Sequence, residues 1–315
     1  MTVKLYLMNI KQPTIRQLQL VQALARYQSL SVVAEKLFIS QPSVSIQLKN
    51  LSELIGLPVY QAHGRKLELT DAGKAVLRSA NQIFQTLDNL KTDIGNLQGV
   101  VTGTLSISVV TTAQYFLPLL LAAFNKNHPN VDVKLEIGNR EMVYSRLRDN
   151  SDDFYLFSQI PEGIEVIETP FLTNEVVVVA PERHELALQS KISLARLSHY
   201  PFILREQGSG TRETVISLFN KYGYELREKM TIASSEAIKQ AVSAGLGLAI
   251  LSRHSLDFGL TPGLKILEVE HFPIKNKWRL VQRASQNQSL LAKAFQQFMT
   301  ENGGDILANA VKNKT

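Results

Sequence analysis

SLSVVAEKLFISQPSVSIQLKNLSELIGLPVYQAHGRKLELTDAG, residues 29–73, is the stretch that decides the fold of the N-terminal part of the chain. Residues 31–38 predict a short helix with Ser31 as its N-cap, and the next two residues predict a tight turn. Another helix begins at Gln41, with proline in its first turn, where proline is favoured. Upstream, the apolar spacing of residues 14–26 predicts a first helix. Three helices in this order are typical of a helix-turn-helix.

The third predicted helix has one apolar and one polar face. Four of its apolar residues recur at spacings of four, three and four residues, so they face the core. These are Val44, Leu48, Leu51 and Ile55, and the residues left facing outward are Pro42, Ser43, Ser45, Ile46, Lys49 and Asn50. Residues 59–69 then predict a hairpin with Arg65 at its tip. This pattern predicts a winged helix-turn-helix whose third helix offers short polar side chains to DNA bases.

A long amphipathic helix is predicted from residue 70 to residue 97. Its apolar residues alternate between spacings of four and three, which is typical of a coiled-coil seam rather than of a helix lying on its own core. The seam residues are Val76, Ala80, Ile83, Leu87, Leu90, Ile94 and Leu97. The repeat favours a dimerising helix, and a single strut between domains is the alternative.

The composition limits the classes of protein to consider. The chain has 315 residues, enough for two or three domains, and 44% of them are hydrophobic, which excludes a disordered chain. Residues 1–72 hold eight Lys or Arg and four Asp or Glu, so they carry +4 of the net charge of +6. This concentration favours a polyanionic partner for that segment, with a solvated basic face as the alternative.

Other classes are disfavoured by what the sequence does not contain. The absence of cysteine excludes disulfides and thiolate metal sites. No apolar run reaches the ~18–20 residues of a membrane span. Residues 1–13 do not resemble a signal peptide. We therefore expect a cytoplasmic protein with no membrane partner.

The pattern changes at Gly103 to strands alternating with helices, which predicts an α/β module with a parallel sheet covered by helices. Strands are expected at residues 105–109, 131–137, 155–157, 176–179, 202–204, 248–251 and 280–281. Helices are expected up to Phe124 and at residues 140–149, 211–221, 236–243 and 289–299, with a polar tail over 302–315. The length of this module favours two subdomains with a ligand cleft between them.

In this order of parts the chain resembles the LysR-type transcriptional regulators, most specifically over residues 29–73. The resemblance implies a winged helix-turn-helix domain over residues 1–69, a linker and dimerisation helix over 70–102 and an effector-binding domain over 103–315. That domain would have two Rossmann-like subdomains, as in periplasmic binding proteins: I, about 103–170 and 275–315, and II, about 171–274. The chain departs from the family pattern at Val32 and Ser52, so the phosphate contact that the family makes at position 32 is not carried over to this chain. The resulting candidate DNA-binding residues are Ser31, Gln41, Pro42, Ser43, Ser45, Ile46, Lys49 and Arg65.

The C-terminal module is similar to one branch of that family, the regulators of carbon-fixation genes. The matching segments are VVTTAQYFLP (109–118), GNRE (138–141), LREQGSGTRE (204–213), SSEAIKQAVSAGLG (234–247) and LSRH (251–254). Members of this branch respond to small anionic metabolites, including phosphorylated sugars, 2-phosphoglycolate and NADPH. Gln114 stands where lysine is frequent and Ser235 where asparagine is frequent, so the identity of the ligand is not carried over.

Three strand-to-helix junctions can each offer hydroxyls or backbone N–H groups to an anion. Ordinary helix capping is the alternative at each junction, and Arg140 has the alternative of pairing with an acid. The candidate effector-binding residues are Thr111, Thr112, Asn139, Arg140, Gln207, Gly208, Ser209, Thr211, Arg212, Ser234 and Ser235. Among them, Arg212 is expected to be the most selective cation, because its planar fork can bind an anion through two hydrogen bonds.

No catalytic constellation is recognisable, so an enzyme is not expected. The six histidines are scattered without metal-ligand spacing. Asp152 and Asp153 are adjacent on the approach to a strand, so their side chains are expected to point to opposite sides.

We therefore expect a regulator, acting as an activator, that binds double-stranded operator DNA, a small anionic metabolite and its own copies in a homotetramer. No cofactor is expected, and RNA polymerase is left open as a partner. The alternative is a small-molecule binding protein or enzyme with an incidental helix-turn-helix.

Overall fold

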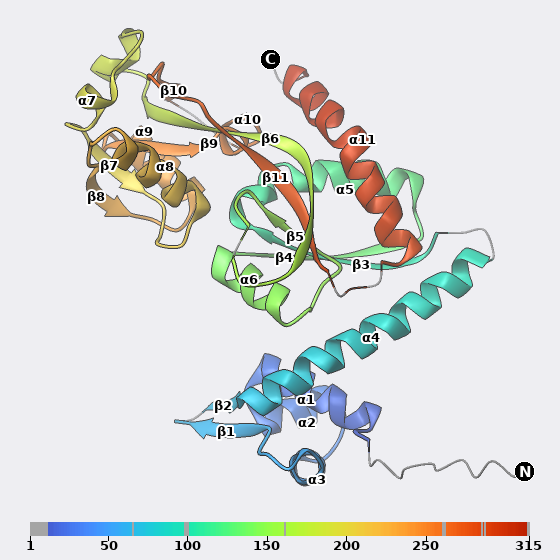
Figure 1. Cartoon of the computed structure of the whole chain (residues 1–315). Coiled ribbons are helices and arrows are strands. Elements are labelled where there is room, and N and C mark those ends of the chain that lie inside the picture. Colours follow the sequence, from blue (N-terminus) through green and yellow to red (C-terminus); the bar gives the residue numbers. More distant parts are fainter. Residues whose placement is uncertain are drawn as a thin grey trace, which may run out of the picture. The chain divides into compact units, whose positions relative to one another are not determined.

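The computed structural model describes residues 12–64, 66–97, 101–160, 162–259, 263–284, 286 and 288–313 (Figure 1). Within these residues the chain divides into two compact units. The first comprises the chain up to Asp88 together with Arg148–Ser151, and the second comprises Asn89–Leu147 together with the chain from Asp152. No helix in the described part of the chain is both long enough and apolar enough to cross a membrane.

Three helices form the body of the first unit: α1 (Ile15–Tyr27), α2 (Leu30–Lys36) and α3 (Gln41–Ile55). Each begins at a hydroxyl side chain that accepts a hydrogen bond from the first turn, which satisfies one of the free N–H groups there. The cap of α2 is Ser29, which accepts from Val32 N, so the prediction of Ser31 as the cap is wrong. Ser31 lies two residues later, exposed in the first turn of α2.

The core of this unit confirms most of the predicted inward face of α3. Val44, Leu48 and Leu51 are fully buried, together with apolar residues of α1 and α2. Ile55 is 37% exposed, so its assignment to the core is wrong. It follows the last buried turn, next to the C-cap Gly56, whose φ of +77° ends the helix.

The wing is a two-stranded antiparallel hairpin, β1 (Tyr60–His63) and β2 (Lys66–Leu69). It leads into α4 (Asp71–Leu97) through Thr70, whose hydroxyl donates to Pro58 O at 2.6 Å and accepts from Gly73 N at 3.1 Å. A Cβ on Gly73 would overlap the carbonyl oxygen of Val59, so this junction requires glycine. Arg65, at the predicted tip of the wing, lies outside the described residues.

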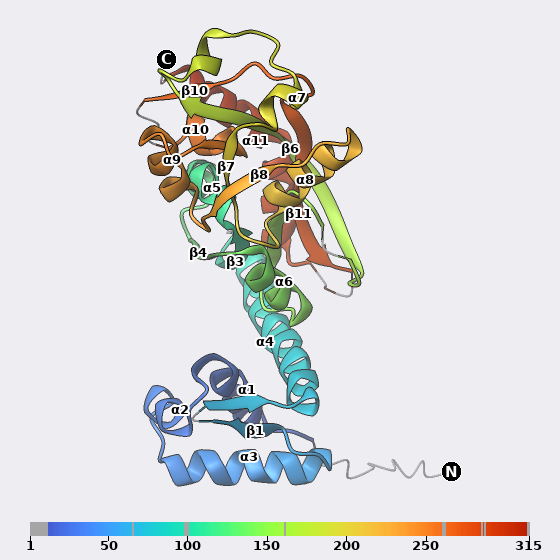
Figure 2. The same ribbon diagram turned by 90° about the vertical axis from the view of Figure 1, so that its left-hand side faces the viewer.

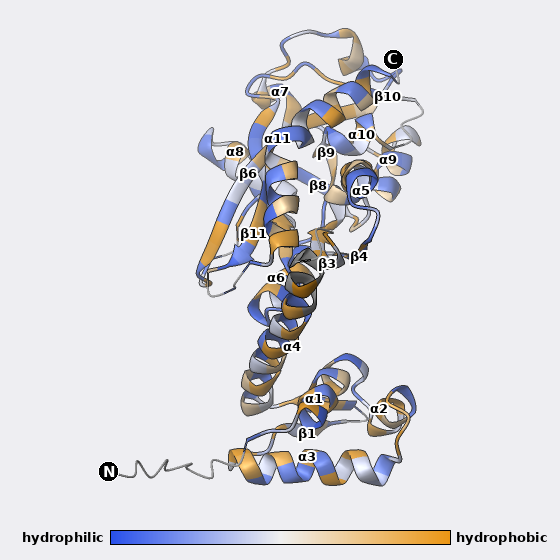
Figure 3. Cartoon of the chain, turned by 90° about the vertical axis from the view of Figure 1, so that its right-hand side faces the viewer, coloured by the Kyte–Doolittle hydropathy of each residue, from blue (hydrophilic) through white to orange (hydrophobic). Residues whose placement is uncertain are grey.

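The predicted seam of α4 divides into two parts. Val76 and Ala80 are buried in the core of the first unit. The next four seam residues are 40–55% exposed in the single chain: Ile83, Leu87, Leu90 and Ile94. Figure 3 shows hydrophobic residues recurring along this helix. The side chain of Leu97 lies outside the described part.

The second unit is built on one mixed sheet in the order β4-β3-β5-β11-β6-β9-β7-β8. Its strands are β3 (Gly103–Val110), β4 (Val131–Gly138), β5 (Phe154–Phe157), β6 (Val166–Pro181), β7 (Pro201–Leu204), β8 (Arg227–Thr231), β9 (Leu248–Ser252), β10 (Leu264–Ile266) and β11 (Ile274–Arg283). β3 is parallel to β4 and β5, and β7 is parallel to β8 and β9. The expectation of a parallel sheet is wrong at its centre, because the long strands β6 and β11 are antiparallel to each other.

Helices cover this sheet. They are η1 (Thr111–Tyr115), α5 (Leu117–Asn127), α6 (Arg140–Arg148), η2 (Glu185–Leu188), α7 (Leu194–Leu197), α8 (Gly210–Lys221), α9 (Ser235–Ser243), α10 (His254–Asp257) and α11 (Leu290–Lys312). α5 and α11 lie side by side (Figure 1). The expected polar tail after residue 301 is wrong: α11 continues to Lys312, and Gly303 and Leu307 are buried on it.

Apolar residues gather around the two ends of the long strands. One core joins β3, α5 and α11 with Trp278 and Leu280 of β11. A second joins β7, α8 and β9 with Val176 and Val178 of β6. Since β6 and β11 contribute to the sheet at both ends, they are the connection between two subdomains within this unit.

Candidate functional site

A pocket lies where the two subdomains of the second unit meet. About 380 Å³ of space free of protein atoms lies within its outline, a volume that includes open solvent at its mouth. Its lining comes from the ends of β3, β5 and β7, the middle of β11 and the starts of η1, α6 and α8: Val110, Thr111, Thr112, Arg140, Phe157, Ser158, Gln159, Arg205, Glu206, Ser209, Gly210, Thr211 and Trp278. Ligands of open α/β sheets bind outside strand ends of this kind.

The two threonines after β3 are not used as helix caps. Val110 is the N-cap of η1, and no side chain caps that short helix. The Thr111 hydroxyl accepts a hydrogen bond from Arg205 Nη2 at 3.0 Å. Thr112 is 7% exposed, and its hydroxyl has no hydrogen-bond partner among the described residues. A polar group in this position can bind a ligand without first breaking an internal contact.

Arg205 supplies a buried cation to the pocket, with only 4% of the residue exposed. Its guanidinium makes two parallel contacts with the adjacent Glu206, from Nε at 2.7 Å and from Nη2 at 2.8 Å. Nη1 donates to Ser235 Oγ at 3.2 Å. Because Thr111 belongs to one subdomain and Ser235 to the other, this one guanidinium links the two subdomains.

A second arginine joins the two subdomains directly. Arg140 begins α6, and its Nη1 donates to the carboxylate of Glu213 in the first turn of α8. Close by, Gln159 Nε2 donates to Thr214 Oγ1 at 2.7 Å. The alternative interpretation of Arg140, that it pairs with an acid, agrees with this contact.

Arg212 lies outside the pocket lining. Its guanidinium binds Glu228 of β8 through contacts of 3.1 and 2.7 Å and donates to Arg205 O at 2.9 Å. Its hydrogen bond, ahead of that from Thr231, lowers the pKa of Glu228. This arginine is therefore occupied in holding β8 and the start of α8 together.

The remaining expected effector residues lie at the rim or act as caps. Asn139 Oδ1 accepts from Met142 N at 2.8 Å, and Ser234 Oγ accepts from Ala237 N at 3.3 Å. Gln207 and Gly208 are exposed, whereas Ser209 is buried and lines the pocket with Thr211. The structure thus brings Thr111, Thr112, Arg140, Ser209 and Thr211 together, with Ser235 reached through Arg205.

Sequence reasoning missed Arg205, Gln159 and Trp278. Arg205 and Gln159 each follow an apolar strand end, which is the same signal that pointed to Thr111. Trp278 gave no such signal, because it lines the pocket from β11, which is distant in sequence from the other lining residues. It is the only tryptophan of the protein and is 1% exposed.

A buried histidine lies behind Trp278. Trp278 Nε1 donates to His254 Nδ1 at 3.5 Å, and the ring of Phe116 packs against both side chains. Burial lowers the pKa of His254 to about 4. Tyr115 of η1 has the opposite shift, because burial and the nearby Glu236 raise its pKa to about 12. Both groups are therefore uncharged at neutral pH.

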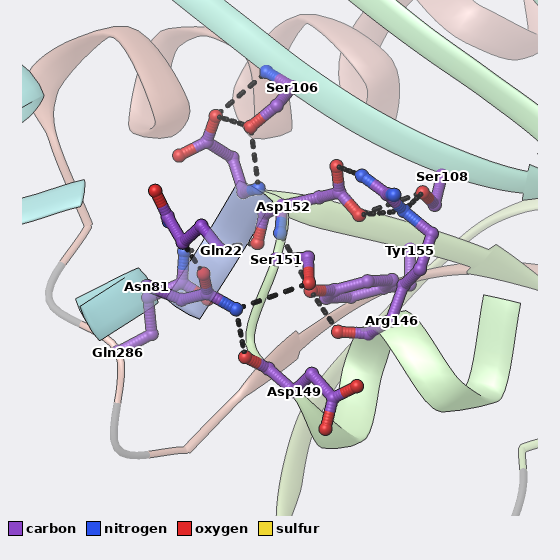
Figure 4. Close-up of polar contacts among 11 residues, drawn as sticks. Gln22, Asn81, Ser106, Ser108, Arg146, Asp149, Ser151, Asp152, Tyr155 and Gln286 are labelled. Atoms are coloured by element: carbon purple, nitrogen blue, oxygen red, sulfur yellow. Dashed lines mark hydrogen bonds and ion pairs between the residues drawn. The ribbon is translucent and has the colours of Figure 1, made fainter. Parts of the chain in front are cut away.

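A polar cluster fixes the helix that carries Arg140. Figure 4 shows the Arg146 guanidinium of α6 facing Asp152, with contacts of 2.9 and 2.7 Å, and Nε also donates to Ser108 Oγ at 2.7 Å. Asp153 instead accepts from the backbone and hydroxyl of Ser106. The expected opposite orientation of the two aspartates agrees with these separate partners. The hydrogen bonds of Asp152 and Asp153 connect the segment after α6 to Ser108 and Ser106 of β3. In the described part of the chain no group of three or more His, Asp or Glu could hold a metal ion.

The outward face of α3 is the other polar surface. Figure 2 shows α3 along one edge of the first unit. Gln41, Pro42, Ser43 and Lys49 are exposed, Ile46 is 57% exposed and Ser45 is half-buried. The Ser43 hydroxyl lies 2.8 Å from that of Ser40, and Lys49 lies 3.8 Å from Glu53. These contacts are local to the helix, so its outer face stays open.

Two family models match the chain. One, the LysR substrate binding domain, matches residues 98–304, and the other, the bacterial regulatory helix-turn-helix protein of the lysR family, matches residues 15–74. The chain belongs to the LysR family. It is a DNA-binding transcriptional regulator and not an enzyme.

Curated relatives of this LysR protein match along nearly its whole length. The transcriptional activator CmpR of Synechocystis sp. is 40% identical over 92% of this chain and 96% of its own. A RuBisCO operon transcriptional regulator of Acidithiobacillus ferrooxidans is 39% identical over 93% of this chain and 95% of its own. These names agree with the resemblance to regulators of carbon-fixation genes.

Solved structures agree with the fold. The regulatory domain of Synechocystis CcmR, solved in complex with 2-PG, has a TM-score of 0.60 and 38% identity, covering 63% of this chain and 98% of that one. The LysR-family regulator CbnR has a TM-score of 0.67 and 21% identity over 91% of this chain and 98% of its own. The second likeness shows the fold alone.

Proposed function

We propose that this regulator controls carbon-fixation genes and that a small anionic metabolite binds the pocket between its two subdomains. The observation that carries the proposal is the buried guanidinium of Arg205, which lines the same pocket as the unpartnered hydroxyl of Thr112. A planar guanidinium binds carboxylate or phosphate through paired hydrogen bonds. The complex of the CcmR regulatory domain with 2-PG supports a ligand of this class.

The ligand must compete with internal carboxylates. Arg205 and Arg140 are each already paired, with Glu206 and Glu213 respectively. An incoming anion that takes over either arginine leaves a glutamate to be solvated or moved, so only part of the interaction energy appears as affinity. Because Arg140 and Glu213 lie on different subdomains, replacing their contact also changes what holds the subdomains together. Such a differential contact is what an allosteric effector requires.

Calorimetry with the full-length protein tests this proposal. We expect one or more of 2-phosphoglycolate, ribulose 1,5-bisphosphate, 2-oxoglutarate and NADPH to bind below about millimolar, about 4 kcal/mol of binding free energy. Trp278 fluorescence should change with the same dissociation constant. Thr112→Val should weaken binding, and Thr300→Val, on the exposed side of α11, should not. Absence of binding by all four compounds, or equal binding by Thr112→Val and the wild type, would refute the assignment of the pocket as an anion-binding site.

We propose that DNA is read by the outward face of α3. Its members are Gln41, Pro42, Ser43, Ser45, Ile46 and Lys49, joined by Ser31 on α2 and Arg65 of the wing. Loss of a base contact in Ser45→Ala should cost about 1–3 kcal/mol at particular operator positions, whereas loss of a phosphate contact in Arg65→Ala should weaken binding to all sequences. Unchanged affinity of both variants in gel shifts with the upstream intergenic DNA would contradict this surface.

We propose that the protein self-associates through α4. The exposed residues Ile83, Leu87, Leu90 and Ile94 form an apolar stripe that needs a partner helix. A homotetramer built from two such dimers, acting as an activator in the cytoplasm, fits the family, with domain boundaries at residues 1–69, 70–102 and 103–315. Leu87→Lys combined with Leu90→Lys should disrupt dimers and DNA binding together in sedimentation and gel-shift measurements. A wild-type monomer at micromolar concentration would refute the dimer.

A further inference from the structure

Phe38 has an unfavourable backbone conformation in the turn between α2 and α3. Its φ is +54°, in the left-handed region that a bulky side chain rarely adopts. The hydrogen bonds define the turn: Ile39 N donates to Ala34 O at 3.0 Å, and Phe38 N donates to Glu35 O at 3.2 Å. These are the two bonds of a Schellman motif, and Phe38 occupies the position at which glycine is usual.

The ring of Phe38 gains nothing from the folded chain in return. The residue is 93% exposed, the largest exposed fraction among the exposed large hydrophobic residues of the described chain. A phenyl ring left in water forgoes the stabilisation that burial would give. The turn itself is held without the ring, because Arg16 Nη2 donates to Leu37 O at 3.0 Å. Both the backbone and the side chain thus carry a cost that the isolated protein does not offset.

The position of the turn indicates what offsets this cost. Phe38 lies two residues before Ser40, the N-cap of α3, and the N-terminal residues of a recognition helix contact base edges in the major groove. The apolar feature of that groove is the C5 methyl of thymine, which phenylalanine can contact. We propose that the Phe38 ring packs against a thymine methyl of the operator, next to the bases read by α3.

The test compares two glycine variants that relieve the same backbone conformation. Gln28 also has a φ of +54° and ends α1. Phe38→Gly and Gln28→Gly should both raise the thermal midpoint, because glycine adopts this conformation without a steric penalty. Only Phe38→Gly should lose operator affinity, by about fivefold to tenfold in fluorescence anisotropy. Equal operator affinity of Phe38→Gly and wild type would overturn the proposal.

Deoxyuridine scanning identifies the contacted base. Replacing single operator thymines by deoxyuridine removes only the C5 methyl, and the wild type should lose affinity at one or more positions. At one of them Phe38→Gly should show no further loss, whereas Gln28→Gly should respond like the wild type. If Phe38→Gly keeps the full sensitivity at every thymine, the contact is not with a methyl group and the proposal fails.

The contact extends the DNA-binding surface proposed for α3, and the two can fail separately. If Ser45→Ala and Arg65→Ala both keep full affinity while Phe38→Gly loses it, the surface proposed for α3 is wrong and the contact of Phe38 stands. If Ser45→Ala loses operator affinity while Phe38→Gly keeps it, the surface proposed for α3 stands and the contact of Phe38 is refuted.

Discussion

The DNA-facing side of α3 and the pocket between the subdomains are both polar, but their side chains are held differently. On α3 the polar residues contact only near neighbours on the same helix, as Ser43 does with Ser40. In the pocket Arg205 binds Glu206, Thr111 and Ser235 from three segments of the chain. A surface of the first kind can meet a large partner without rearrangement. A site of the second kind has to exchange internal contacts for those of its ligand, which is how binding can change conformation.

The largest expected effect is a loss of stability in the N-terminal unit, which carries α3, without a change in the unit that holds the pocket. Gly73→Ala places a methyl group on the carbonyl of Val59, so the N-terminal unit should lose about 3 kcal/mol or more of unfolding free energy. Operator binding should be lost while ligand binding by the second unit persists. Gly304→Ala is the control, because no atom lies within 4 Å of its Cβ. Wild-type stability of Gly73→Ala in denaturant unfolding would contradict the packing of this junction.

A smaller effect distinguishes the two arginines near the pocket. Arg205→Lys keeps the charge but loses the planar fork, so ligand affinity should fall by about tenfold or more. Arg212→Lys makes the matched change at a guanidinium that binds Glu228 outside the pocket, and it should leave ligand affinity near the wild-type value. Calorimetric titration of both variants decides between them. A larger loss in Arg212→Lys would restore the sequence-based choice of Arg212 as the selective cation.

A third expected effect is on the pH dependence of stability at the junction of the subdomains. Because burial lowers the pKa of His254 from 6.5 to about 4, unfolding takes up a proton when the pH lies between these values. Stability is therefore fully present above about pH 6.5 and should fall by about 2 kcal/mol between pH 7.5 and pH 5 from this residue alone. His254→Phe removes this contribution, so its unfolding free energy should vary less over that range. An identical pH profile for the variant and the wild type would show that His254 is not buried in its neutral form.

The two regions also differ in how far the sequence predicts them. The inward face of α3 followed from spacing alone for Val44, Leu48 and Leu51, because helical periodicity is a local property. The junction threonines were found because Thr111 follows an apolar strand. Arg205 and Trp278 were missed since their importance depends on which strand ends meet, and the antiparallel β6 and β11 that bring them together were predicted only in part. The pairing of Arg212 could not be predicted, because its partner Glu228 lies on β8, a strand that was not predicted.

The central claim is that an anion in the pocket changes how the protein binds DNA, and reciprocity offers its most direct test. Calorimetry should give the dissociation constant of 2-phosphoglycolate for the full-length protein alone and for the protein saturated with its operator. If ligand and DNA are coupled through the subdomains, the two constants should differ by about fivefold or more, and the ligand should change operator affinity by the same factor. Equal dissociation constants in the two titrations would contradict the account.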